Sequence, residues 1–134
     1  MHGIHVADLL RDALAISGCD ERQVGNFDSY GTIELKLINL PSLKVGMLDN
    51  DLWLWSTLSD AGEMLLSYRS EQLLRFLIQG CAFARTQQMQ LIELGEKLEV
   101  RVMLAKSAYD SAQALADTID SYLTALSSLC DVIH

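Results

Sequence analysis

The chain has 134 residues, of which 50% are hydrophobic and 21% are charged, which excludes a disordered protein and leaves room for one domain. Its 18 acidic residues outnumber its 10 basic ones, and the net charge of −8 argues against a nucleic-acid-binding protein, which needs a basic surface. No apolar run is long enough to span a membrane, and charges interrupt the apolar N-terminal run, so we expect a cytoplasmic protein. The three cysteines lack metal-binding spacing and are expected to be inert thiols.

The N-terminal half predicts one helix followed by three strands. Apolar residues recur at helical spacing over residues 4–17, and the stretch 18–31, rich in Gly, Asp and Asn, predicts a loop. Alternating residues predict strands at 32–37 and 43–47, and a third strand follows at 52–55. This third strand is apolar on both faces, which indicates either a central strand or an exposed binding surface.

The second predicted helix carries more apolar residues than one stripe requires. Asp60 and Glu63 resemble a capping box at its start, its clearest part is 70–79, and Gly80 ends it. A helix that is apolar on more than one side packs both inside its own domain and against something else.

The C-terminal part predicts a hairpin over 87–105, turning at 95–97, and then a long helix capped by Ser107 with Asp110. The apolar seam of this helix consists of Leu115, Ile119, Tyr122, Leu126, Leu129 and Ile133. The order α-β-β-β-α-β-β-α predicts the α+β class, with an antiparallel sheet and helices packed on it, as one domain over 1–134.

No group of residues predicts catalysis, a metal or a cofactor. His2 and His5 lack a cysteine or carboxylate at ligand spacing, and residues 49–51 lack the Gly and Glu of a calcium loop, which favours a plain turn. Neither a phosphate-binding glycine motif nor a nucleophile elbow occurs. Cys19 lies beside two acidic residues, which disfavour a reactive thiolate. We therefore expect a protein that is not an enzyme.

Two tryptophans are the most informative feature of the third strand. Trp53 and Trp55 lie two residues apart and therefore on the same face. They are explained equally well as core filling or as an aromatic platform for a partner, because Trp is favoured at binding hot spots.

Three segments of the chain, RDALAISGCD, FDSYGTIELKLINLPSLKVGMLDNDLWLWSTL and IQGCAFARTQQMQL, resemble the SpaK/InvB family of type III secretion chaperones. This is the class IB, multi-effector group. The resemblance extends over essentially the whole chain and is strongest over residues 6–58 and 79–91. Several linked segments in the same order are more specific than any one motif.

The resemblance implies a homodimeric, cytoplasmic bacterial chaperone that is not an enzyme and uses no cofactor. Such a chaperone binds extended N-terminal segments of several effectors, keeps them soluble and secretion-competent, and delivers them to the secretion ATPase. A dimeric small-molecule-binding or protein-interaction module unrelated to secretion is the alternative.

Two sets of residues are hypothesised to carry these interactions. The apolar excess of the second helix assigns the dimer interface to Leu73, Phe76, Leu77 and Gly80. The first helix and the following hairpin are assigned the effector-binding groove, with Leu10, Leu14, Leu43, Val45, Met47, Trp53 and Trp55 as its candidates.

Overall fold

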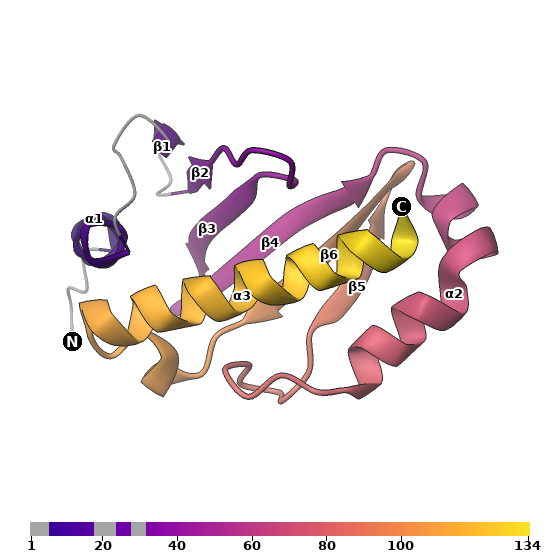
Figure 1. Cartoon of the computed structure of the whole chain (residues 1–134). Helices are drawn as coiled ribbons and strands as arrows, with labels where there is room; N and C mark the ends of the chain where they lie inside the picture. Colours follow the sequence, from indigo (N-terminus) through magenta and orange to yellow (C-terminus); the bar gives the residue numbers. More distant parts are fainter. Residues whose placement is uncertain (1–5, 18–23, 28–31) are drawn as a thin grey trace.

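The computed structural model describes residues 6–17, 24–27 and 32–134, and of 24–27 it describes the backbone (Figure 1). Its elements in chain order are α1 (Val6–Ile16), β1 (Val24–Phe27), β2 (Ile33–Leu35), β3 (Leu43–Leu48), β4 (Asp51–Ser59), α2 (Gly62–Ile78), β5 (Gln90–Leu94), β6 (Lys97–Met103), the 3₁₀ helix η2 (Lys106–Tyr109) and α3 (Ala112–Ile133). No helix among these residues is long and apolar enough to cross a membrane.

The strands form one antiparallel sheet in the order β1-β2-β3-β4-β6-β5. The predicted α+β class is therefore confirmed. Along the central strand β4, buried residues alternate with partly exposed ones, which is the pattern of a sheet covered on one face.

The long helix α3 lies across the sheet, with α1 near its N-terminal end and α2 beyond the sheet edge formed by β5, and both shorter helices contact α3 (Figure 1). Its predicted apolar seam is buried throughout. Tyr122, in the middle of this seam, donates a hydrogen bond from its phenol to Ser56 Oγ of β4 at 2.8 Å, and both residues are buried. The covered face of the sheet is therefore the one that carries Ser56 and, two residues away on either side, Leu54 and Leu58.

Both predicted helix caps are wrong. Helix α2 begins after Ala61 without a side-chain cap, and the nearest hydroxyl, Ser59 Oγ, accepts from the Ala61 N–H at 2.9 Å. Helix α3 is capped by Ser111, whose Oγ accepts from the Ala114 N–H at 3.1 Å. The predicted cap residue Ser107 lies instead within η2, a 3₁₀ turn that precedes α3.

The strand boundaries also differ from those expected. Strand β1 lies within the predicted loop, β2 is shorter than the predicted strand at 32–37, and β4 extends beyond 52–55 in both directions. The predicted hairpin is confirmed as β5 and β6, with Gly95 at φ +62 in its turn, where glycine is favoured. His2, His5 and Cys19 lie outside the described residues.

Candidate protein-binding surfaces

The sheet face opposite α3 carries both tryptophans. Trp53 and Trp55 alternate with the buried residues of β4 and are partly exposed. Trp53 pairs across strands with Gly46 and Met103, and Trp55 pairs with Lys44 and Arg101. Within the described part of the chain, the tryptophans are therefore not core filling but belong to the open face of the sheet.

A groove of about 300 Å³ lies on this open face. We call it the Trp groove, and its lining consists of Thr32, Gly46, Met47, Leu48, Trp53, Trp55, Leu94, Glu99 and Arg101. Leu48 is 58% exposed and Leu94 is 49% exposed. Large apolar side chains left open to solvent around a concave site are typical of a surface that binds a partner.

Gly46 shapes this groove. A Cβ atom at this position would lie 3.1 Å from Cη2 of Trp55 and 3.1 Å from Oγ1 of Thr32. The indole of Trp55 can therefore lean over strand β3 only because residue 46 has no side chain.

An ion pair forms the polar part of the groove lining. Glu99 is only 6% exposed, and its Oε1 accepts a hydrogen bond from Arg101 Nη2 at 2.9 Å. The hydroxyl of Thr57 lies 3.5 Å from the other carboxylate oxygen. The buried Nε of Arg101 has no hydrogen-bond partner among the described residues.

The structure separates the seven predicted effector-binding residues into two groups. Leu10, Leu14, Leu43 and Val45 are at most 5% exposed and lie in the hydrophobic core, so they do not line the groove. The burial of Leu43 and Val45 follows from the register, because Val45 pairs with Leu54 on the face that α3 covers, whereas Leu10 and Leu14 are buried residues of α1. Met47, Trp53 and Trp55 do line the groove.

The predicted dimer-interface residues lie mostly on the inner side of α2. Leu73 is buried in the core at 2% exposure, and Phe76 and Leu77 are partly buried against it. Gly80 is exposed just past the helix end, at φ +81. The apolar residues that α2 leaves open to solvent are Met64, Tyr68, Leu74 and Ile78, each more than half exposed. We call these four residues the outer face of α2.

Periodicity could have found the outer face of α2. Its four residues fall within an arc of about 120° at 100° per residue, which is the width of one apolar stripe. Arg69 has non-helical backbone angles, φ −130 and ψ 20, which divide α2 into two parts. Met64 and Tyr68 belong to the first part, and Leu74 and Ile78 belong to the second.

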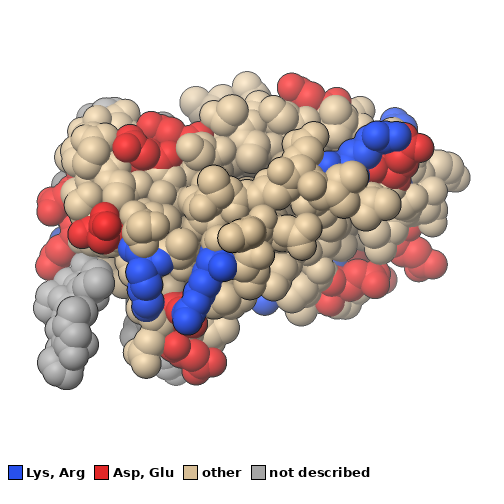
Figure 2. Space-filling model, turned by 90° about the horizontal axis from the view of Figure 1, so that it is seen from below, with Lys and Arg blue, Asp and Glu red and all other residues tan. Residues whose placement is uncertain are grey.

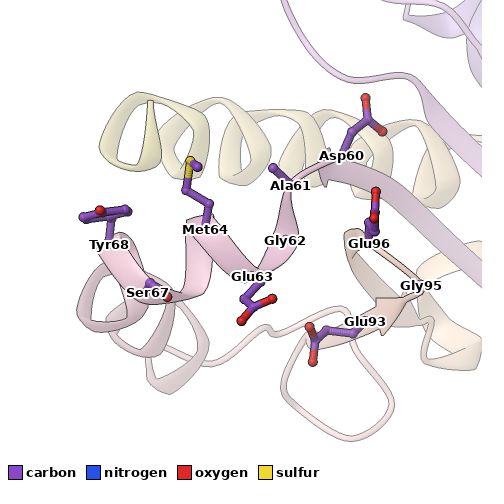
Figure 3. Close-up of a pocket in the computed structure, with 10 residues that line it drawn as sticks. All are labelled: Asp60, Ala61, Gly62, Glu63, Met64, Ser67, Tyr68, Glu93, Gly95 and Glu96. Atoms are coloured by element: carbon purple, nitrogen blue, oxygen red, sulfur yellow. The ribbon is translucent and has the colours of Figure 1, made fainter.

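An acidic cleft of about 510 Å³ lies between the start of α2 and the turn of the β5–β6 hairpin (Figure 3). Its carboxylates come from Asp60, Glu63, Glu93 and Glu96. They do not converge on a common point, and within the described residues no group of three or more His, Cys, Asp or Glu side chains could hold a metal ion.

The two thiols in the described part of the chain have no features of an activated nucleophile. Cys81 and Cys130 are free and partly buried. Burial raises the pKa of the Cys81 thiol, and burial together with the neighbouring Asp131 raises the pKa of the Cys130 thiol. Both therefore remain largely protonated at neutral pH, whereas catalytic cysteines depend on a lowered pKa.

Uncharged side chains dominate the middle of the face seen in Figure 2, and Asp and Glu gather toward its margins. The exposed apolar side chains of the Trp groove and of the outer face of α2 are the kind of surface found in protein–protein interfaces. The described surfaces thus indicate protein binding more strongly than chemistry on a small substrate.

Comparisons with known proteins agree with this assignment. The model of the Invasion protein B family matches residues 18–95, more than half of the chain. The chain is 30% identical over 122 residues to the surface presentation of antigens protein SpaK of Salmonella typhimurium and of Salmonella typhi, with 91% of this chain and 90% of each relative covered.

The fold is similar to that of the Yersinia pestis type III secretion chaperone SycH, solved in complex with a stable fragment of YscM2. The TM-score is 0.58 at 13% identity, with 91% of this chain and 97% of that chain covered. At this identity the likeness concerns the fold. The family model and the two curated relatives confirm the resemblance given by the sequence segments, and the chain belongs to the Invasion protein B family, the SpaK/InvB family.

Proposed function

We propose that this protein is a cytoplasmic type III secretion chaperone that binds extended N-terminal segments of several effectors. It keeps these segments soluble and secretion-competent and delivers them to the secretion ATPase. The observation that carries the proposal is the open, apolar Trp groove, in a member of the SpaK/InvB family whose fold is also that of a secretion chaperone.

The groove suits an extended client segment on physical grounds. Side chains of a strand alternate, so every second residue of an extended segment can enter an apolar groove while the others face solvent. Trp53 and Trp55 supply rigid apolar surface, and Met47 at the rim supplies an adaptable one. Such a surface makes loose demands on sequence, as a chaperone with several clients requires.

The outer face of α2 supports a homodimer. A helix surface with four large apolar residues more than half exposed is unfavourable in water unless a partner covers it. Glu71 and Arg75 form a 3.1 Å ion pair on the exposed side of the same helix. If two copies pack their α2 helices antiparallel about a two-fold axis near position 73, Glu71 faces Arg75 of the second copy. Tyr68 then faces Ile78 of the second copy, so the surface is complementary to itself.

Effector binding is tested in two steps. Deleting the gene in the source bacterium and comparing the secreted proteins by mass spectrometry identifies the clients. Their N-terminal segments are then co-expressed with wild type and with Trp53→Ala, with Val132→Ala as a control at an exposed position on α3. We expect co-purification with wild type and with the Val132 variant, and a loss with Trp53→Ala. Equal co-purification with all three would contradict the assignment of the groove.

The dimer is tested separately by light scattering. Ile78→Asp places a charge on the outer face of α2, and we expect a dimeric wild type and a monomeric variant. A variant that stays dimeric would contradict the assignment of this face to the interface. A monomeric wild type would contradict the proposed dimer itself.

A further inference from the structure

The Trp groove has a charged group in an otherwise largely apolar lining. Arg101 is the single cation among the described residues that line it. It lies on β6, beside Trp55 in the β4–β6 pairing, and β6 is flanked by a strand on each side. Its side chain is 25% exposed, so part of the guanidinium faces the groove.

The hydrogen bonding of Arg101 is incomplete. A guanidinium carries five N–H donors in a fixed plane. Nη2 donates to Glu99 Oε1 at 2.9 Å, which fixes the orientation of that plane against a buried carboxylate. Nε is buried and finds no hydrogen-bond partner in the part of the chain that the structure describes. A buried donor without an acceptor is unfavourable, and a native structure that retains one usually has a use for it.

A carboxylate is the ligand that suits this arrangement. It can approach a guanidinium side-on and accept from Nε and a terminal nitrogen at the same time. Because Nε is screened from solvent, the side chains around it have to shift as the acceptor enters. Trp55, which pairs with Arg101 across the strands, provides an apolar wall beside it, and Trp53 and Leu94 line the same groove. The groove therefore offers an apolar subsite and an acid-binding subsite side by side.

We infer that Arg101 makes the Trp groove select client segments in which an Asp or Glu lies within two residues of an aliphatic side chain. The inference rests on the proposed function and adds a chemical class of client to it. The selection runs against the overall charge of the protein, because a chain with net charge −8 repels acidic segments at long range. Recognition of an acid by this chain therefore needs a local, oriented donor such as Arg101.

The experiment uses the full chain and a phage-displayed library of random linear peptides as the probe. Arg101→Lys is the informative variant, because lysine keeps a positive charge opposite Glu99 but has no Nε and no planar fork. Arg85→Lys is the matched control, since Arg85 forms an ion pair with Asp51 and does not line the groove. Thermal unfolding of both variants checks that each is folded.

Wild type and Arg85→Lys are expected to enrich peptides with an acid next to an aliphatic residue, and Arg101→Lys is expected not to. One enriched peptide is then synthesised with its acid and with the matching amide. By fluorescence anisotropy, wild type should bind the amide about tenfold more weakly, because one charge-assisted hydrogen bond contributes about that factor. Arg101→Lys should discriminate less between the two, because lysine keeps the charge but has no Nε and no planar fork.

Three outcomes overturn the inference: no acid enrichment, equal discrimination by Arg101→Lys, or no peptide whose binding depends on Trp53. The last of these is expected if a second copy of the chain covers the groove. The proposed function is judged independently, by co-purification of the effector segments with the wild-type chain. If those segments bind and the Arg101 variant retains them with the same preference, the proposed function stands and the selection by Arg101 does not.

Discussion

Replacing Tyr122 by Phe removes one hydroxyl from the interior and leaves the shape of the ring unchanged. The phenol donates to Ser56 Oγ at 2.8 Å, and the two residues are 1% and 0% exposed. Ser56 then loses this donor in a place that water does not reach. Leaving a buried polar group unpaired costs about 1–3 kcal/mol, so we expect the free energy of unfolding to fall by that amount.

The hydrogen bond is isolated by a double-mutant cycle. Ser56→Ala leaves the Tyr122 hydroxyl without its acceptor and should cost about as much as Tyr122→Phe. The double variant has neither polar group and should be close to wild type, because removing both partners of a buried bond is nearly neutral. Urea unfolding followed by circular dichroism, at one fixed protein concentration, measures all four proteins. If the two single effects add to within about 0.5 kcal/mol in the double variant, the residues are not coupled and the reasoning is refuted.

Three further predictions concern the helix cap, the groove and pH. Ser111→Ala should lower the free energy of unfolding by about 1 kcal/mol because it removes the α3 cap, whereas Ser107→Ala should change it by less than about 0.5 kcal/mol in the same urea assay. Gly46→Val should displace the indole of Trp55, which tryptophan fluorescence reports, and should weaken effector co-purification without dissociating the dimer. Burial raises the pKa of Tyr122, so the unfolded chain releases this proton at lower pH than the folded chain does. Stability should therefore fall as pH rises above about 10, and less steeply in Tyr122→Phe.

The elements that could be predicted from the sequence are those whose burial follows one period along the chain. The seam from Leu115 to Ile133 repeats at helical spacing and is buried in α3, and the alternation predicted for β2 and β3 buries Ile33, Leu35, Leu43 and Val45. The hairpin of β5 and β6 follows from glycine at its turn. In each case local propensity, period and turn chemistry agree.

The elements that were missed depend on contacts between distant parts of the chain. Strand β1, with the sequence VGNF, has no alternation and carries Gly and Asn, which are rare in strands, between Val and Phe, and it is a strand through its pairing with β2. The cap of α3 is Ser111, four residues beyond the predicted Ser107. The sequence does not distinguish the two, because serine is a favourable cap at either position. The choice between them depends on where η2 ends.

The candidate site shows where periodicity stops being informative. A period of two places Trp53 and Trp55 on one face and Leu43 and Val45 on one face, but it does not say whether these faces are the same. The register decides, because Val45 pairs with Leu54 and not with a tryptophan. If the pairing of β3 with β4 were shifted by one residue, Val45 would lie on the open face, as the predicted groove required. The sequence pattern therefore predicts the strands that line the candidate groove, and the pairing of those strands determines which of their side chains are exposed.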